Sequence, residues 1–562
     1  MVIIIKKINA MKNKLLSMIA IATILIGLNS CRDVEDLTPS VSREGINGIT
    51  ASFINDESAE NSFSSEINYE NGIITVVFPY NYPLTSDNVL TMSDLTKMRV
   101  VANLDDNVTV SPSILYMDFT KDNYITVTDQ SKNKKMYKVV AEIRKSDKCV
   151  ISNFELPSLG LSGIIDEGNK VISLISIDAI GSTLASVNVS HGATMNPDPT
   201  KVAQNYDSNF QITVTAQNGT NSAVYTVKKA VPAKTEFGMR VGSAKVLWSK
   251  KLNTDLGISV LNLTGGMAVT KDYVVLNTRA QNSIYLDRKT GALAGTVNLG
   301  DKVGNLINFY NTCDDNNNIL LCNLAPNAGA FKAWRIKGVT GTPEDYIEWN
   351  GGVAIGRKLS IRGSLDGDAI ISAPILAAGN KFARWQVKGG VLQSQTPEII
   401  TITGIGGSWN TNCDVVYSDP KVLTSDYFVS YYAAPYQFSW VDGITNTVKA
   451  RAAVVSSNWV QNAVDYNVFN GCPYAVSNSI NSFSWGSDDK IYLYDVSTSS
   501  GLDNTVWSAP IGTYGGKDNG GVNANATGDV ALKVSDNGYY MYLYFMFTNG
   551  CVVCVQYDCI DM

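Results

Sequence analysis

Histidine is almost absent from this chain of 562 residues, which contains His191 and no other. Ser-His-Asp and Cys-His catalysis depend on a histidine base, and histidine is a common metal ligand. His191 falls in the N-terminal half beside a turn, where a surface role is expected. The scarcity therefore argues against triad chemistry and against a histidine metal site in the C-terminal half.

Glutamate is scarce after residue 235, where the chain has only Glu236, Glu344, Glu348 and Glu398. Glycoside hydrolysis usually needs two carboxylates, one of them an acid with a raised pKa. Aspartates are plentiful, but most fall in turn-like runs such as 314–318 and 364–368, without EF-hand spacing. We expect no catalytic residue, no metal site and no cofactor; a glycosidase or lyase remains an alternative.

No apolar run beyond residue 30 is long enough to span a bilayer. The chain is also acidic. Residues 1–30 hold four lysines and no acid, so their removal would change the net charge from −6 to −10. A chain of this charge does not neutralise phosphates, so nucleic acid is not an expected partner.

The N-terminus has a secretory pattern. Lys12 and Lys14 precede the apolar run 15–28, and Ser30-Cys31 follows. The sequence Leu28-Asn29-Ser30-Cys31 resembles a bacterial lipobox, although Asn29 departs from the usual small residue. We expect a signal peptide over 1–30 and a lipidated linker over 31–47, with acyl chains on Cys31 as the membrane anchor. The acidic cluster 32–36 resembles the export signal of Bacteroidetes surface lipoproteins.

Eight further cysteines leave the disulfide question open. Cys551 and Cys554 form a CxxC, but the run around them is strand-like. Residues three apart on a strand face opposite sides. A shared metal or a redox pair is therefore not expected there.

Alternating apolar and polar residues, separated by Asn-Gly and Asp-Gly turns, predict an all-β protein. Two similar units come first. Each has a segment ending in Pro112 or Pro197, then Ile-Thr-Val-Thr, then Tyr-x-Val. The last two segments predict a closing hairpin. We expect two immunoglobulin-like sandwiches, over 48–145 and 146–234, that act as spacers.

A longer repeat occupies 235–562. Third-strand segments recur with Trp334, Trp385 and Trp440, which are 51 and 55 residues apart. A period near 50 in four-strand units indicates a β-propeller. Six units fit, and the segment 245–252 is expected to complete the last one and close the ring. A seven-bladed or open arrangement is the main alternative.

All nine tryptophans lie between Trp248 and Trp507. Six fall at repeat positions and are expected to pack between strands: Trp248, Trp334, Trp349, Trp385, Trp440 and Trp507. The other three fall in connections between strands, which in a propeller emerge on one face. With other aromatic and polar residues of that face they form our candidate ligand site: Trp409, Trp459, Trp485, Tyr431, Tyr432, Tyr436, Tyr310, Arg279, Arg357 and Asn410.

Aromatic plates beside amides and guanidinium groups suit a sugar ring, whose C–H faces stack while its hydroxyls form hydrogen bonds. The alternative is that these tryptophans fold back over the propeller mouth. The whole arrangement resembles the surface glycan-binding lipoproteins of Bacteroidetes polysaccharide-utilisation systems, which carry stacked spacers and a distal carbohydrate-binding domain.

The resemblance implies a non-catalytic, lipid-anchored outer-membrane protein facing the cell exterior. It implies a polysaccharide ligand and an outer-membrane importer complex as partners. Two alternatives remain: a protein-binding adhesin or assembly module, and a propeller glycoside hydrolase or lyase.

Overall fold

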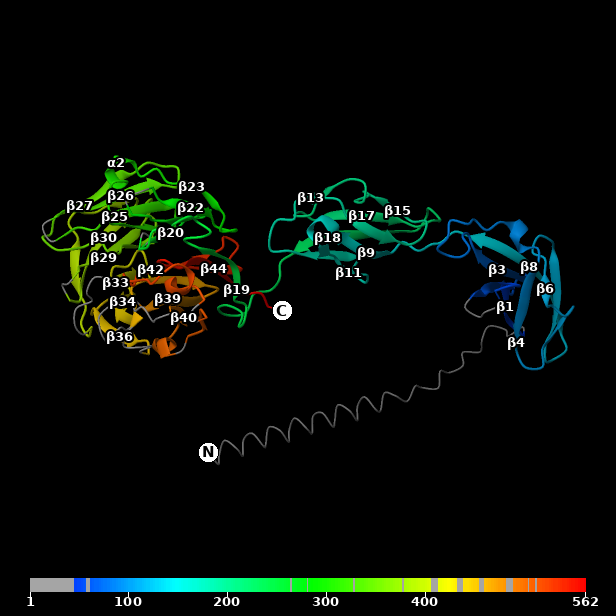
Figure 1. The fold of residues 1–562 in the computed structure, drawn as a ribbon. Coiled ribbons are helices and arrows are strands. Elements are labelled where there is room, and N and C mark those ends of the chain that lie inside the picture. Colours follow the sequence, from blue (N-terminus) through cyan, green and yellow to red (C-terminus); the bar gives the residue numbers. More distant parts are fainter. Residues whose placement is uncertain are drawn as a thin grey trace, which may run out of the picture. The chain divides into compact units, whose positions relative to one another are not determined.

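The computed structural model describes the following residues of the chain: 45–56, 61–262, 265–279, 282–326, 329–376, 379–405, 413–431, 438–453, 459–481, 489–503, 505–510 and 513–561. The chain divides into two compact units, Met1–Ala230 and Val231–Met562. Both consist of β-strands joined by turns, as Figure 1 shows, so the all-β prediction is confirmed. No helix among the described residues is long and apolar enough to cross a membrane.

The first unit begins with one eight-stranded sheet in the order β5-β7-β8-β3-β2-β1-β4-β6. Alternate residues of these strands are buried in a cluster that includes Ile74, Ile125 and Tyr137. The strands are β1 Ile46–Phe53, β2 Phe63–Asn68, β3 Ile73–Pro79, β4 Met98–Leu104, β5 Thr109–Ser111, β6 Tyr116–Met117, β7 Asn123–Thr128 and β8 Lys134–Arg144.

The following ten strands form three smaller sheets, in the orders β10-β9-β14, β11-β12-β18-β17-β15 and β13-β16. Their apolar side chains form a second, separate cluster around Phe154, Ile212 and Tyr225. The strands are β9 Ile151–Leu156, β10 Leu161–Ser162, β11 Ile164–Asp166, β12 Val171–Ile175, β13 Ser182–Thr183, β14 Ser186–Val189, β15 Thr194–Asn196, β16 Gln204–Asn205, β17 Phe210–Thr215 and β18 Ser222–Ala230.

The two strand sets share a topology. The path β5-β7-β8-β3 corresponds to β15-β17-β18-β12, and in both the last pair is parallel. The predicted closing hairpins are confirmed, because Ile125 pairs with Tyr137 and Ile212 pairs with Tyr225. Each tyrosine is fully buried, which explains why the Tyr-x-Val pattern recurs.

The described residues of the second unit form six antiparallel sheets. The first five follow one another along the chain. The first sheet consists of β20 Met267–Val269, β21 Tyr273–Leu276, β22 Ile284–Asp287 and β23 Leu293–Thr296, and the second of β24 Phe309–Cys313, β25 Asn318–Asn323, β26 Phe331–Lys337 and β27 Glu344–Trp349. The third consists of β28 Ser360–Gly363, β29 Ala369–Pro374, β30 Lys381–Lys388, β31 Val391–Leu392 and β32 Glu398–Thr401, and the fourth of β33 Cys413–Tyr417, β34 Tyr427–Tyr431, β35 Ser439–Asp442 and β36 Thr447–Arg451. The fifth consists of β37 Trp459–Val460, β38 Val464–Phe469, β39 Cys472–Asn481, β40 Lys490–Asp495 and β41 Trp507–Ser508.

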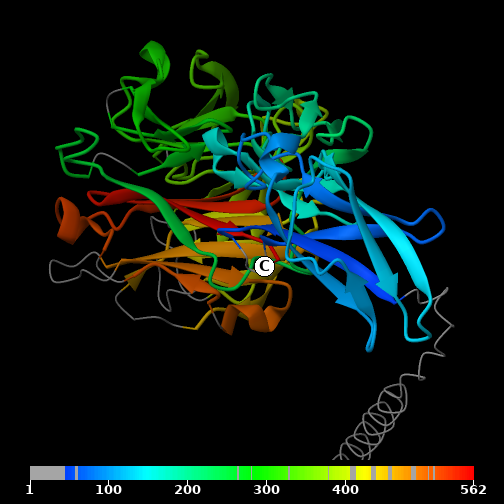
Figure 2. The same ribbon diagram turned by 90° about the vertical axis from the view of Figure 1, so that its right-hand side faces the viewer.

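The sixth sheet combines the end of the chain with a strand from before the first sheet. Its order is β19-β44-β43-β42, from β19 Lys245–Lys251, β44 Cys551–Asp558, β43 Tyr540–Phe547 and β42 Gly528–Val534. Figure 2 shows the green β19 alongside the red β44. The predicted role of 245–252 as the fourth strand of the last unit is confirmed. Arg240, which lies before β19, forms an ion pair at 2.7 Å with Asp558, the last residue of β44.

The six tryptophans expected to pack do so. Trp248, Trp334, Trp385 and Trp440 are buried, and each joins a hydrophobic cluster formed by strands of two neighbouring sheets. The ring of Trp349 lies edge-on to Trp385. The ring of Trp507 lies edge-on to Tyr557. The indole N–H of Trp385 donates to the Gln395 carbonyl at 3.0 Å.

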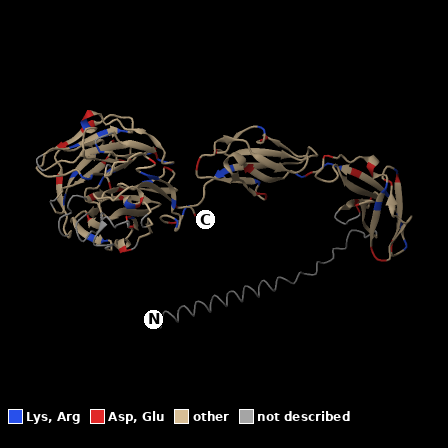
Figure 3. Cartoon of the chain, viewed as in Figure 1, with Lys and Arg blue, Asp and Glu red and all other residues tan. Residues whose placement is uncertain are grey.

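None of the eight described cysteines is in a disulfide. Cys551 and Cys554 lie in β44, as the strand interpretation expected, and both are buried. Acidic and basic residues are interspersed along the chain in each part (Figure 3). No group of three or more metal-ligating side chains occurs in the portion of the chain that the structure describes.

Candidate functional site

Three aspartates occupy the same position in three sheets. Asp414, Asp465 and Asp529 are each the second residue of a strand, in β33, β38 and β42. Each carboxylate accepts a backbone N–H from a strand of the next sheet, from Val464 at 3.1 Å, Leu532 at 2.7 Å and Met267 at 2.6 Å. The three carboxylates therefore join consecutive sheets in the interior of the unit.

Asp529 has the fullest set of donors. It accepts a hydrogen bond from the Tyr310 hydroxyl at 2.7 Å and pairs with Lys358 at 3.0 Å. The Lys358 ammonium also donates to the Gly528 carbonyl at 2.7 Å and lies 4.7 Å from the centre of the Tyr310 ring. Lys358, Tyr310 and Asp529 are all buried, so they form a closed polar cluster.

Asp414 lies in the same interior. Its carboxylate accepts the Ser360 hydroxyl and the Val415 backbone N–H. Burial, together with the negative charge of Asp529, raises the pKa of Asp414 to about 7 against the opposing effect of Lys358. Asp414 therefore titrates close to neutral pH.

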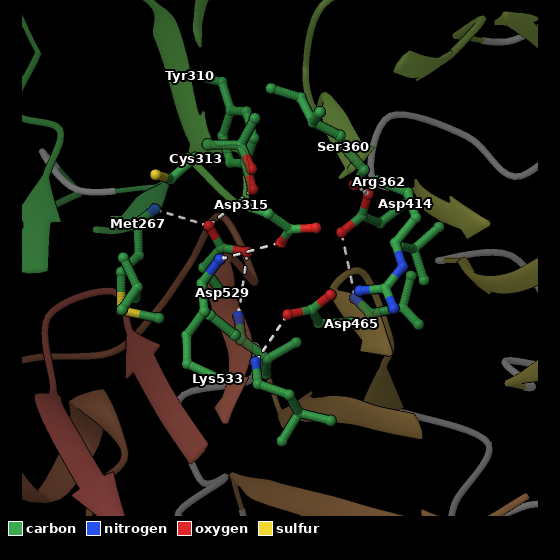
Figure 4. Close-up of a pocket in the computed structure, with 18 residues that line it drawn as sticks. Met267, Tyr310, Cys313, Asp315, Ser360, Arg362, Asp414, Asp465, Asp529 and Lys533 are labelled. Carbon is green, nitrogen blue, oxygen red and sulfur yellow. Dashed lines mark hydrogen bonds and ion pairs between the residues drawn. The ribbon is translucent and has the colours of Figure 1, made fainter. Parts of the chain in front are cut away.

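A cavity of about 40 Å³ lies on one side of this cluster, lined by Asp414, Asp465 and Asp529 with Lys533 and Arg362. Figure 4 shows the three carboxylates reaching into this space from different strands. Burial also raises the pKa of Asp465, which Lys533 opposes. A cavity of this volume holds a few water molecules and excludes a sugar ring.

A second cavity, of about 30 Å³, shares Tyr310 with the first, because this residue lines both. Its lining includes Arg279 and Arg357, and we call it the arginine pocket. Among its described lining residues there are three cations and no carboxylate, the third cation being Lys358. The remaining wall is Asn277, Asn308, Phe309, Thr527, Leu324 and two glycines, Gly265 and Gly356.

The two arginines are half-buried. Burial lowers the pKa of Arg279. Burial lowers the pKa of Arg357, and the like charge of Arg279 lowers it further. No described residue accepts a hydrogen bond from the Arg279 side chain. Two partly desolvated like charges thus lie near each other in a chain that is acidic overall.

Asn277 shapes the pocket. Its side-chain oxygen accepts the backbone N–H groups of Gly265 and Gly266, the first at 3.1 Å and the second at 2.5 Å. Its amide donates to the Phe309 carbonyl at 2.6 Å. The buried side chain of Asn277 therefore links the segment before β20 to the first residue of β24. Arg279 follows Asn277 by two residues, so this network fixes the backbone close to Arg279.

Of the residues predicted to bind a ligand, the structure brings three together: Tyr310, Arg279 and Arg357 line one pocket. Tyr310 was expected in a loop but lies in β24 and is nearly fully buried, with an exposed fraction of 4%. Tyr310 lines the pocket, and its hydroxyl donates a hydrogen bond to Asp529.

Two other expectations are corrected. Tyr431 was expected on the loop face, but it ends β34 and is fully buried in a hydrophobic cluster, because the strand runs through it. Trp459 was expected in a connection, but it begins the short strand β37 and pairs with Asn481. The remaining predicted residues lie outside the described residues: Cys31, Trp409, Asn410, Tyr432, Tyr436 and Trp485.

The sequence interpretation missed the buried aspartates and Lys358. It read aspartates as turn residues, which holds for Asp366 but not for these. A signal was present: Asp414, Asp465 and Asp529 each stand at the start of an apolar strand-like run, one per repeat. Lys358 follows Arg357 in a glycine-containing connection, and nothing local distinguishes it from a surface lysine.

The first unit has a larger hollow, of about 510 Å³, beside β3. Phe63, Tyr82 and Leu84 line it together with Arg144, and Leu84 is 68% exposed. The Tyr82 hydroxyl donates to Asp56 at 2.5 Å, and burial with this bond raises the pKa of Tyr82 to about 12. The walls are mixed in character, with no convergent set of free polar groups among the residues described there.

The fold and the site define an all-β protein of several modules, whose C-terminal unit surrounds a buried polar cluster and a cationic pocket. The chain belongs to the family described as Domain of unknown function (DUF8500), which it matches over residues 247–558. Residues 26–141 match Domain of unknown function (DUF5018), and residues 151–229 match Domain of unknown function (DUF8499). No curated protein matches the chain.

Proposed function

We propose that the six sheets of the second unit are the blades of a closed β-propeller, and that the first unit consists of two immunoglobulin-like spacers. Three observations support closure. β19 pairs with β44, Asp529 accepts the Met267 N–H, and the indole N–H of Trp248 donates to the Arg288 carbonyl at 3.0 Å. Each interaction joins the last sheet to a residue near the beginning of the unit.

We propose that the protein is a non-catalytic surface lipoprotein that binds a polysaccharide on the loop face of the propeller. Arg279, Tyr310 and Arg357 carry this proposal. They come from three separate segments, yet they line one pocket. Convergence of polar groups around an aromatic wall is typical of a binding site.

The remaining parts follow from this function. A lipid on Cys31 would hold the chain at the outer membrane, and the spacers would carry the propeller outward. Bound polysaccharide would pass to an outer-membrane importer complex. Trp409, Trp459 and Trp485 would supply the stacking surfaces for sugar rings.

The test is affinity electrophoresis and calorimetry of the full-length protein against a panel of polysaccharides. The triple variant Trp409→Ala, Trp459→Ala, Trp485→Ala is expected to lose binding at least tenfold. A matched control replaces three exposed aromatics elsewhere, Tyr116, Tyr124 and Phe237, by alanine and is expected to bind normally. Binding to no polysaccharide, or full binding by the triple variant, would refute the proposal. Capture of a protein that sugars do not displace would favour an adhesin.

A second candidate, a glycoside hydrolase or lyase, is favoured by Asp414. A carboxyl with a pKa of about 7 is suited to donate a proton at neutral pH. Its cavity of about 40 Å³ leaves no room for a sugar ring, so catalysis would require the interior to open. Release of reducing ends or unsaturated products by the native protein, abolished in Asp414→Asn, would establish this alternative.

A further inference from the structure

We propose that the side chains of Lys358 and Asp529 condense into an intramolecular amide, a covalent link between the segment before β28 and strand β42. The ion pair at 3.0 Å is the reactant of this step. The bond would connect two residues that are 171 positions apart, in a chain whose described cysteines form no disulfide. The modification is independent of the ligand that the second unit binds.

The reaction balances without an oxidant or another reactant. The Lys358 ammonium group transfers one proton to the Asp529 carboxylate, which leaves a neutral amine beside a carboxylic acid. The amine nitrogen then forms a bond to the carboxyl carbon, as a nucleophilic lysine does with other carbonyl groups. The nitrogen passes a second proton to the departing oxygen, and the C–O bond breaks. The products are one amide and one water molecule.

Burial and proximity of the two groups favour this step. Their side chains are only 2% and 3% exposed. Burial disfavours charged groups, so the neutral amine and acid lie closer in energy to the ion pair than they would in water. The fold also holds the reacting groups together before the reaction begins. By contrast, both side chains of the Lys302–Asp345 pair are more than half exposed.

The two oxygens of the Asp529 carboxylate have different partners. Lys358 contacts Oδ1, whereas Oδ2 accepts the Met267 backbone N–H at 2.6 Å and the Tyr310 hydroxyl at 2.7 Å. Negative charge develops on the oxygen that is retained when an amine attacks a carboxyl carbon, and two fixed donors stabilise such a charge. Oδ2 is therefore the retained oxygen, and Oδ1 leaves as water.

The cavity of about 40 Å³ gives the departing water a place in the interior. Asp529 and Asp414 both line this cavity, which holds a few water molecules. Burial raises the pKa of Asp414 to about 7, so this carboxyl exchanges a proton at neutral pH. Water in the cavity can carry that proton between Asp414 and the departing oxygen.

The test is mass spectrometry of the folded full-length protein. Trypsin does not cleave after an acylated lysine. We therefore expect a branched tryptic peptide in which residues 358–362 are joined to residues 518–533 through Lys358 and Asp529. The intact protein should be lighter by one water molecule than its sequence requires, and the Asp529→Ala variant should show no such loss.

A denaturing gel gives a second readout. An internal bond keeps the denatured chain more compact, so the native protein should migrate faster than Lys358→Met. Lys388→Met removes an exposed lysine of the same unit and should keep the branched peptide, the mass loss and the fast migration.

The native protein decides even where a variant does not fold, because the branched peptide is detected without one. Cleavage after Lys358 together with recovery of 518–533 only as a linear peptide would overturn the inference. A loss of one water that maps instead to an Asp-Gly turn, such as Asp366-Gly367, would indicate a succinimide and also contradict it. None of these results depends on polysaccharide binding, so the proposed function is tested separately.

Discussion

Lys358 and Asp529 form an ion pair at 3.0 Å in which the side chains are only 2% and 3% exposed. The lysine precedes β28, and the aspartate is in β42, 171 residues later. Removing one partner of a buried pair leaves the other charged and without compensation. The folded state of the second unit is therefore stable only when the segment before β28 and strand β42 lie close enough for the two charges to pair.

Lys358→Met is expected to lower the free energy of unfolding by about 3–5 kcal/mol, because Asp529 would keep its charge in the interior. Chemical denaturation followed by tryptophan fluorescence measures this for the second unit alone, since all nine tryptophans lie there. Lys388→Met, at an exposed position, is the control and should change stability by less than about 0.5 kcal/mol. If both variants changed the free energy of unfolding by a similarly small amount, the ion pair would not be important for the stability of the folded state.

Asp414 is expected to make stability depend on pH. Its pKa is about 7 in the folded state and near 3.8 when unfolded, so between these values the folded state binds more protons. The contribution of this group to stability is therefore largest below pH 4 and is lost as the pH rises to 7. The full change is roughly 4 kcal/mol.

The measurement compares denaturation midpoints from pH 4.5 to 7.5 in the native protein and in Asp414→Asn. The variant should lose the downward slope, whatever its absolute stability. Ser360 and the Val464 N–H contact the same carboxylate, so an overall destabilisation of the variant is also expected. An unchanged slope would mean that Asp414 is ionised throughout.

Trp248→Ala is expected to destabilise the second unit by about 3–5 kcal/mol. This side chain is 7% exposed, packs beside Tyr544 and donates to the Arg288 carbonyl, so it joins the last sheet to the first. Trp507→Ala, at a half-buried position, should cost less. Equal losses would argue that the contact between the last and the first sheet depends on neither residue in particular, and differential scanning calorimetry can rank the two.

Arg279→Met is expected to raise the stability of the ligand-free protein by up to about 1 kcal/mol, because it removes a partly desolvated charge near Arg357. The same variant should bind polysaccharide less tightly. Melting temperatures with and without ligand test both statements together. A variant that is less stable by more than about 1 kcal/mol would show that Arg279 has a structural role.

The repeat patterns in the sequence predicted much of the fold. The hairpins Ile125–Tyr137 and Ile212–Tyr225 followed from alternation and from recurrence of the same short strings. The strand containing Trp248 was assigned to the last sheet because it resembled another fourth strand. Both predictions use local patterns, which the chain expresses wherever the segment folds.

The candidate site was predicted in part. Arg279, Tyr310 and Arg357 were chosen because their connections belong to one face, and they do line one pocket. Tyr431 was chosen by the same reasoning and is buried, since the position at which a strand ends decides whether its last residue is exposed. A shift of one residue reverses that outcome.

Patterns along the chain were enough to predict that it is all-β, that its strands come in repeated units and that its packing tryptophans recur with the repeat. Folding in three dimensions was needed to show that Lys358 meets Asp529, that Asp414 is buried beside them and that two arginines line one pocket. Alternation of apolar residues is a local property and can be read along the chain. Charge compensation is a property of distances in space, and residues 171 apart in sequence give no local sign that they will meet.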